Sequence, residues 1–374
     1  MKINVIGTIF GLTGYDSHTR SLVNALYPLA DVRLSTQLIP GWESQCNDAE
    51  LNMIMKQGKE TDTTLIITTP HNWKLYTGLG INMGYCVWEG DSVPVSYIDE
   101  MLNPNIHFIL VPSEHTKTAI IRTFFQGQNT QNKSGYPEQL NRDEQNFVDK
   151  IKIIPHGVDS TLFYPIAKKE DNKFTFICNK GWRGTLWDRG GVQYVIKAFA
   201  EEFKDEEKVE LLVKLNPAYM PAEILNQSIT QLQLPPHKCK IHVNLENIPF
   251  NKLVNLYNQA DVFVCATRCE AFNLPGLEAM SCGLPTIQTN FGGQLDYMTD
   301  DNSLFIQSTL EEVKEDIMYE EIKWAVPDME DLKLNLRWAY DNQDKIKEKG
   351  LQALEDSKKF TWDNSAKKIL NILE

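Results

Sequence analysis

The chain has 374 residues, of which 42% are hydrophobic and 23% charged, and its formal net charge is −13 at pH 7. The length favours two domains, and the acidic balance argues against a nucleic-acid partner, which would require a basic surface. No run of about 18 apolar residues occurs, so we expect no transmembrane segment, while peripheral membrane contact stays open. The N-terminal residues resemble a strand and not a signal peptide, and the seven cysteines lack metal-binding spacing, so we expect a cytoplasmic protein with buried thiols.

The first half of the chain alternates short apolar strands with helices. We expect strands over 3–6, 65–67, 84–87, 108–111 and 151–154, and helices over 17–27 and 116–125. A loop with Gly7, Gly11 and Gly14 follows the first strand and lets the backbone approach a ligand closely. Its spacing fits neither a dinucleotide fingerprint nor a Walker loop. The polar stretch 126–150 predicts a flexible excursion.

The alternation restarts in the second half, after a linker-like segment around residues 155–165. We expect strands over 174–178, 209–215, 241–243, 262–264 and 303–306, and helices over 191–203, 221–232, 251–259 and 362–373. This pattern predicts an α/β protein with two doubly wound, Rossmann-like domains and a cleft between them. We place the boundary between the domains at residues 165 and 166.

Two glutamates near residue 270 form the most informative motif. Seven residues separate Glu270 from Glu278, and Pro275 between them suits the first turn of a helix that Gly283 is placed to end. The first N–H groups of such a helix form an anion site, and carboxylates suit hydroxyl groups. The stretch therefore predicts a site for a sugar joined to a diphosphate. The alternative is that both glutamates are ordinary solvated surface residues. The spacing by itself favours this alternative.

Three cations cluster with four glycines at another strand-to-helix junction. Lys180, Arg183 and Arg189 could neutralise a leaving diphosphate, the role that a metal otherwise fills. The alternative is a salt bridge between Arg189 and its neighbour Asp188. Glu89 follows an apolar strand of the first half and is expected to face the cleft. No Asp-x-Asp motif follows a strand in that half, so we predict no metal site.

Together these residues resemble the retaining glycosyltransferases of the GT-B fold, family 4 (group 1). The family's Glu-x7-Glu motif is matched over Glu270–Pro285, its domain junction over Ile153–Asp159, and the segment before the motif over Leu256–Val262. The resemblance implies the GT-B fold, an N-terminal acceptor domain over 1–165 and a donor domain over 166–359. It also implies that a C-terminal helix within 360–374 crosses back to the first domain.

The resemblance implies roles for individual residues. Glu278 binds the ribose of the donor, Glu270 contacts the sugar as a catalytic residue, and the base rests near Ile248. Glu89 takes the place of the family's catalytic-region histidine. The further donor-binding residues are Gly14, Lys180, Arg183, Arg189, Asn273 and Leu274. The chain departs from the family at Gly190, where a phosphate-binding lysine is usual, and at Asn273, where the motif has glycine.

The implied activity is that of a hexosyltransferase. It moves a sugar from a UDP- or GDP-linked donor to a hydroxyl of a saccharide, lipid or protein acceptor by front-side attack, with retention and without a metal or other cofactor. Two alternatives stay open: a sugar-nucleotide epimerase of the same fold, and a glycosyltransferase-like scaffold that has lost catalysis.

Overall fold

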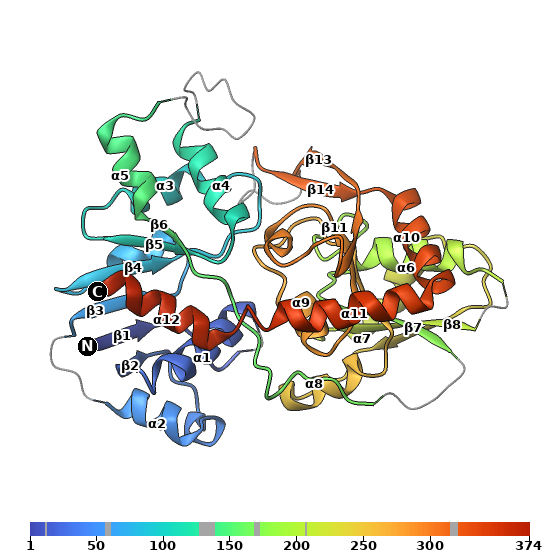
Figure 1. Ribbon diagram of the computed structural model, residues 1–374, viewed down its shortest axis with the longest axis horizontal. Coiled ribbons are helices and arrows are strands. Elements are labelled where there is room, and N and C mark those ends of the chain that lie inside the picture. The colour runs from blue at the N-terminus through green and yellow to red at the C-terminus, as the bar shows by residue number, and fades with distance from the viewer. Residues whose placement is uncertain (12, 57–60, 127–138, 168–172, 206–207, 315–320) are drawn as a thin grey trace. The chain divides into compact units, whose positions relative to one another are not determined.

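The computed structural model describes residues 1–374 except 12, 57–60, 127–138, 168–172, 206–207 and 315–320 (Figure 1). The chain divides into two compact units. Unit 1 consists of Met1–Gly157, Lys314–Ile322 and Phe360–Glu374, and unit 2 consists of Val158–Val313 and Lys323–Lys359.

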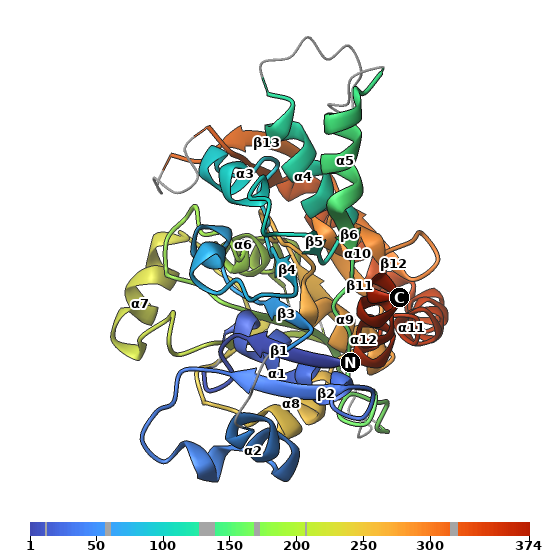
Figure 2. The ribbon, with the colours of Figure 1, turned by 90° about the vertical axis from the view of Figure 1, so that its left-hand side faces the viewer.

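A parallel six-stranded sheet lies at the centre of unit 1, in the order β2-β1-β3-β4-β5-β6 (Figure 2). The strands are β1 (Lys2–Ile6), β2 (Asp31–Ser35), β3 (Thr63–Ile66), β4 (Ile81–Tyr85), β5 (Phe108–Val111) and β6 (Ile151–Ile153). All four residues of β3 are buried, as expected for a strand whose two faces are covered by helices. The strand order reverses between β1 and β3, so the loop after β1 lies at a topological switch point.

Helices cover the sheet of unit 1. They are α1 (Gly14–Leu26), α2 (Asp48–Met55), α3 (Val95–Met101), α4 (Glu114–Phe124), α5 (Arg142–Lys150) and α12 (Trp362–Leu373), with short 3-10 helices η1 (Trp42–Gln45) and η2 (Pro70–Leu75). The last helix, α12, packs beside α1 (Figure 1). The end of the chain thus returns to the first unit, as the resemblance implies.

The polar stretch 126–150 is not irregular throughout, contrary to the prediction. Residues 127–138 lie outside the described residues, but α5 forms the end of the stretch. Asn141 and Glu144 exchange side-chain-to-backbone hydrogen bonds in a capping box, which satisfies N–H groups of the first turn. Phe147 is buried. A cap and one apolar anchor hold this helix, and the average polarity of the stretch conceals both.

Unit 2 is built on a second parallel sheet, in the order β12-β11-β10-β7-β8-β9. The strands are β7 (Phe174–Lys180), β8 (Val209–Leu215), β9 (Lys240–Asn244), β10 (Val262–Cys265), β11 (Thr286–Thr289) and β12 (Ser303–Ile306). The chain winds from β7 outward to β9, then returns to the other side of β7 and winds outward to β12. The switch point between β7 and β10 is where doubly wound sheets bind their ligands.

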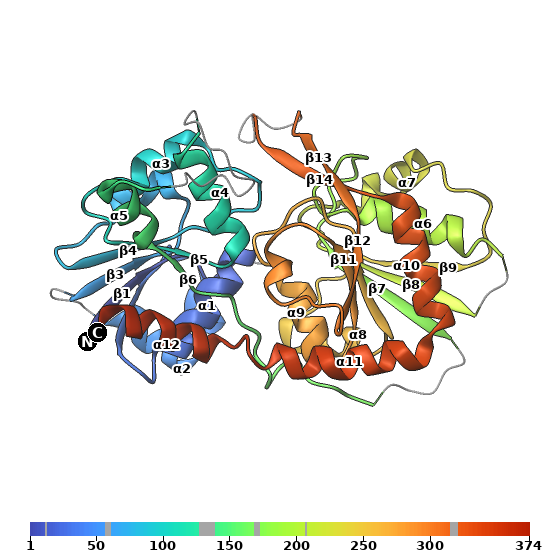
Figure 3. The same ribbon diagram turned by 45° about the horizontal axis from the view of Figure 1, so that its top comes forward.

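The helices of unit 2 include the pair α6 and α10, which pack together in Figure 3. The helices are α6 (Val192–Glu202), α7 (Ala222–Gln231), α8 (Phe250–Tyr257), α9 (Leu274–Ser281), α10 (Met329–Asp341) and α11 (Gln343–Ser357), with the short η3 (Gly293–Asp296). Their apolar faces bury Phe176, Phe199 and Phe203 in one core. Burial of each of these rings away from water stabilises the folded state by about 1.5–3 kcal/mol.

One antiparallel pair in unit 2, β13 (Ser308–Glu312) with β14 (Lys323–Pro327), was not predicted. Thr309, Leu310, Glu311 and Glu312 are all exposed, so β13 has no apolar alternation that could reveal a strand. Among the residues that the structure describes, no helix combines the length and the apolar character needed to cross a membrane.

Candidate functional site

The site is organised around the start of α9, where Asn273 precedes the helix. Asn273 has a left-handed backbone (φ 63°, ψ 67°), which costs most L-residues about 1–2 kcal/mol and which glycine and asparagine adopt most readily. Its amide donates to Gln288 Oε1, and the Tyr297 hydroxyl donates to its carbonyl at 2.9 Å. Asn273 thus adopts a backbone conformation that glycine also favours, and its buried side chain adds polar contacts. Leu274, the next residue, is half-buried in the first turn.

A largely buried ion pair lies beside this helix start. The Lys180 ammonium at the end of β7 donates to Glu270 Oε1 at 2.6 Å and to Asn273 Oδ1 at 2.8 Å. Burial raises the pKa of Glu270, but the charges of Lys180 and Arg189, with hydrogen bonds from Lys180 and Thr267, together hold that pKa below its usual value. Burial lowers the pKa of Lys180, and the Glu270 charge more than reverses this effect. Both groups are therefore charged at neutral pH, and the ammonium keeps a third N–H for a ligand.

The backbone of Glu270 is fixed by the loop after β11. The N–H of Gly293 donates to the Glu270 carbonyl at 2.8 Å, and a Cβ on Gly292 would lie 2.8 Å from the same oxygen. The Thr267 hydroxyl donates to Glu270 Oε1 at 3.1 Å. Glu270 is thus held at both its backbone and its side chain, which prepares the carboxylate for one binding geometry.

The second glutamate of the motif, Glu278, lies within α9 and is 7% exposed. The Tyr257 hydroxyl at the end of α8 donates to Glu278 Oε2 at 2.8 Å, and Asn179 Nδ2 donates to that hydroxyl at 2.9 Å. Burial raises the pKa of Glu278 to about 7, against the lowering effects of Tyr257 and Lys180. One carboxyl oxygen therefore has a fixed partner, while the other can meet a hydroxyl group.

The glycine loop between β7 and α6 explains the missing lysine at Gly190. A Cβ on Gly190 would lie 2.0 Å from the Gly181 carbonyl oxygen, and one on Gly191, at φ +73°, would lie 1.9 Å from the Ala266 carbonyl oxygen. Asp188 accepts the N–H groups of Arg183 and Gly190 at 3.0 and 2.8 Å and so closes the loop. The loop has no room for any side chain at Gly190.

The two arginines of this loop differ in their neighbours. The Arg189 charge acts on Glu270, and the Arg189 carbonyl accepts the N–H of Arg268 at 2.8 Å. Arg183 is exposed, and its charge acts on Asp188. Both arginines are exposed, but the charge of Arg189 acts on Glu270 beside Lys180, whereas that of Arg183 acts on Asp188.

A groove of about 340 Å³ opens beside the predicted base site. Its lining includes Lys214, Leu245, Glu246 and Leu256, from β8, the loop after β9 and α8. Ile248, which we expected beneath the base, lies in the same loop, half-buried, and is not part of the lining.

Gly14 and Glu89 both lie in unit 1. Gly14 begins α1, and a Cβ at this position would meet no heavy atom within 4 Å. The Tyr15 hydroxyl donates to the Val87 carbonyl at 3.3 Å, and His115 Nε2 lies 2.8 Å from the Glu89 carbonyl oxygen. The first bond ties the start of α1 to the segment that carries Glu89, and the second ties that segment to α4.

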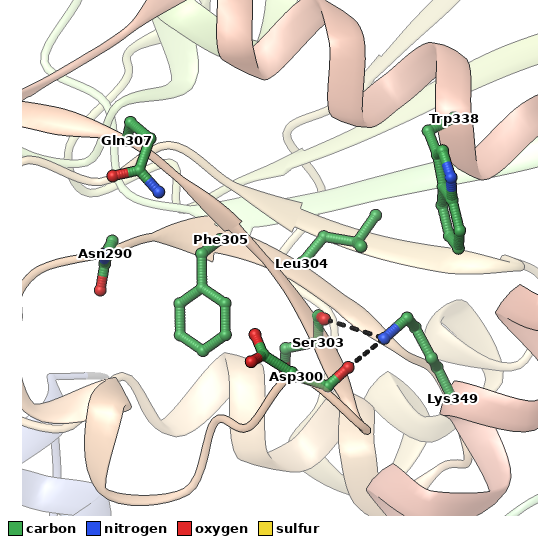
Figure 4. Close-up of a pocket in the computed structure, with 8 residues that line it drawn as sticks. All are labelled: Asn290, Asp300, Ser303, Leu304, Phe305, Gln307, Trp338 and Lys349. Carbon is green, nitrogen blue, oxygen red and sulfur yellow. Dashed lines mark hydrogen bonds between the residues drawn. The ribbon is translucent and has the colours of Figure 1, made fainter.

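A second, more open hollow in unit 2 lies along the edge strand β12 (Figure 4). The Lys349 ammonium lies beside it and donates to the carbonyls of Asp300 and Ser303. Asn335 donates to the Phe305 carbonyl at 3.0 Å. These side chains cover the open edge of the sheet, and the hollow contains none of the predicted site residues.

Sequence reasoning missed the polar partners of the motif, namely Asn179, Tyr257, Thr267, Gln288 and Tyr297. Tyr257 and Glu278 are far apart along the chain, and only the packing of α8 on α9 joins them. The sequence position of Asn179 could have marked it as a site residue, because it adjoins Lys180 at a strand end, where ligand-binding polar residues gather.

Comparison with known proteins agrees with this geometry. A family model described as Glycosyl transferases group 1 matches residues 180–318. A probable sucrose-phosphate synthase of Thermosipho melanesiensis is 28% identical over 233 residues, which are 60% of this chain and 48% of that protein. The chain thus spans about half the length of that relative.

Two solved structures are similar to the chain over nearly its whole length. A sucrose-phosphate synthase from Thermosynechococcus elongatus has a TM-score of 0.67 at 14% identity, covering 100% of this chain and 98% of that one. Anabaena HepE in complex with UDP-glucose has a TM-score of 0.68 at 13% identity, covering 100% and 99%. The motif around α9, the matched family segment and the shared fold agree: residues 180–318 are similar to the group 1 glycosyltransferases, and the chain has the GT-B fold.

Proposed function

We propose that the chain is a retaining, family 4 glycosyltransferase that moves a sugar from a UDP- or GDP-linked donor to a hydroxyl of a saccharide, lipid or protein acceptor. The observation that carries the proposal is the gathering of Lys180, Glu270 and Glu278 around the start of α9. It lies at the switch point between β7 and β10, where a doubly wound sheet binds its ligands. The similarity to a protein solved with UDP-glucose supports a nucleotide-sugar donor.

In this proposal, cations and helix N–H groups stabilise the charge of the leaving diphosphate. The bond between the anomeric carbon and the phosphate oxygen breaks, and negative charge accumulates on that oxygen. The third N–H of Lys180, the Arg189 guanidinium and the N-terminus of α9 are the groups available to receive that charge. Protein cations in this position make a metal unnecessary, so we propose metal-independent catalysis in the cytoplasm.

The acceptor hydroxyl attacks the anomeric carbon from the face that the diphosphate leaves, and its proton passes to the departing phosphate oxygen. Ionised Glu270 accepts hydrogen bonds from the sugar hydroxyls, while Glu278 with Tyr257 holds the ribose. In unit 1, we propose that Glu89 acts on the acceptor side and that Gly14 approaches the phosphate.

The test is an NMR assay of the full chain with 13C-labelled UDP- and GDP-sugars and a panel of hydroxyl acceptors. We expect a glycoside with the anomeric configuration of the donor. Glu270→Gln should lower kcat by about 100-fold, since it removes the charge at the sugar. Glu312→Gln, on an exposed strand, is the matched control and should keep full activity.

The outcomes separate the alternatives. An epimerised free sugar without an acceptor product would assign the chain to the epimerases. Neither binding nor slow donor hydrolysis across the panel would favour an inactive scaffold. Activity should survive EDTA, and a complete loss that Mn²⁺ restores would contradict the metal-independent mechanism.

A further inference from the structure

A buried lysine, Lys214, lies in the groove beside the proposed donor site. Its side chain is almost fully enclosed, with 7% of the residue exposed, at the carboxyl end of β8. Within the described residues its ammonium donates to one acceptor, the Leu215 carbonyl. An ammonium has three N–H donors, so two remain for a ligand. A cation enclosed in this way is costly unless such donors are used.

The sheet register connects Lys214 to the predicted ribose site. Asn179, Lys214 and Asn244 pair side by side on β7, β8 and β9. Residues paired in register on parallel strands point to the same face of the sheet. On that face Asn179 reaches Tyr257, which bonds Glu278. The groove that Lys214 lines also includes Leu256, the neighbour of Tyr257 in α8.

The order of groups along the sheet edge matches the order of parts in a nucleotide sugar. Glu270 follows β10, Lys180 ends β7, Lys214 lies near the end of β8, and Glu246 follows β9. A donor with its sugar at Glu270 and its diphosphate at Lys180 extends its base toward β8 and β9. The groove of about 340 Å³ lies there.

The polar groups of the groove form a defined pattern. Lys214 offers N–H donors, and Glu246 on the same groove offers a carboxylate acceptor. The N–H of Glu246 donates to Asn244 Oδ1 at 2.8 Å, which fixes the loop that carries the carboxylate. Uracil and guanine each have a carbonyl next to a ring N–H, whereas adenine and cytosine have an amino group next to a bare ring nitrogen.

We propose that Lys214 and Glu246 read the base of the donor, Lys214 binding its carbonyl and Glu246 its ring N–H, and thereby select uracil or guanine over adenine or cytosine. This proposal rests on the proposed donor site. An amino group facing Lys214 would leave the buried ammonium unpaired, and such mismatches discriminate more strongly than a loss of apolar contact.

The test is isothermal titration of the full chain with UDP, GDP, CDP and ADP. We expect UDP or GDP to bind at least about 10-fold more tightly than CDP and ADP, as polar mismatch at a buried ammonium predicts. Lys214→Met keeps the length and volume of the side chain and should reduce that ratio to within about 3-fold. Lys240→Met removes the same charge from an exposed position of the same sheet face, outside the groove, and should leave the ratio unchanged.

Thermal melting checks that each variant is folded, and Glu246→Gln provides an independent variant that should also weaken the preference. An unchanged order of bases in both folded variants, or equal affinity of the wild type for all four nucleotides, would overturn the role of Lys214 and Glu246. If none of the four nucleotides binds the wild type, the proposed donor site itself fails. The two failures are thus distinguishable.

Discussion

At the scale of single residues, the two glutamates of one motif differ in charge state. The Lys180 and Arg189 charges and hydrogen bonds together outweigh burial at Glu270 and keep its carboxylate ionised. Burial dominates at Glu278 and raises its pKa to about 7, although Tyr257 donates to it. Neighbouring carboxylates with opposite pKa shifts are typical of sites in which they have different roles. Here the ionised one faces the predicted sugar, and the other faces the predicted ribose.

Glu278 should make the stability of the ligand-free protein depend on pH. Its folded-state pKa of about 7 exceeds the ordinary value of 4.5, so the folded protein binds this proton more tightly than the unfolded chain. The stability from this group is complete below about pH 4.5 and is lost as the pH rises through 7. Glu278→Gln should therefore raise the free energy of unfolding at pH 8 by on the order of 1–3 kcal/mol and change little at pH 4.5.

Urea unfolding at both pH values measures the effect. Glu312→Gln, at an exposed position, should show no such pH dependence and is the control. A stabilisation of Glu278→Gln that is equal at both pH values would show that the carboxyl is not held protonated by burial.

At the scale of elements, two backbone features build the site: the left-handed start of α9 and the glycine loop before α6. Both need residues that tolerate positive φ or close approach, namely Asn273 and Gly191 at positive φ and Gly190 against the Gly181 carbonyl. The loop leaves no space for the family's lysine at Gly190. Lys180, at the end of β7, holds its ammonium beside Glu270, and we propose that it takes the role of that lysine.

Gly190→Ala should destabilise the protein, because its Cβ would lie 2.0 Å from backbone oxygen. We expect a loss of about 2–4 kcal/mol, since the backbone of the loop must move to remove the clash. Gly14→Ala is the control, since its Cβ meets open space. Equal melting temperatures of the two variants would show that the loop is not closed as described.

The sequence predicted regular elements well where apolar patterns were strong. The expected strand over 209–215 coincides with β8, and the expected helix over 362–373 coincides with α12. The sequence-based prediction missed elements that are stabilised by a helix cap, by a single buried side chain or by tertiary contacts. The cap and single apolar anchor of α5 lie within a polar stretch, and the exposed strand β13 has no apolar alternation. The motif located the site, but Tyr257 came from packing between helices that no local pattern encodes.

At the scale of the whole molecule, the chain combines two doubly wound units, and its C-terminal helix belongs to the first. Strand order in unit 2 places the ends of β7 and β10 side by side at the switch point. Lys180, Glu270 and Glu278, on which the proposal rests, come from these two ends and from α9. The fold thus brings residues from distant parts of the chain together, and the central claim is that they form one donor site.

The most direct test of this claim is isothermal titration of UDP and GDP with the wild type, with Lys180→Met and with Lys180→Met/Glu270→Gln. The double variant removes both charges together, which avoids an unpaired buried carboxylate and keeps the unit folded. We expect at least one nucleotide to bind the wild type and its affinity to fall by about 10- to 100-fold in both variants, since a charge-assisted bond to phosphate is lost. The exposed control Lys240→Met should bind as the wild type does. Unchanged affinity in the folded variants would contradict the assignment of the diphosphate site to Lys180 and α9.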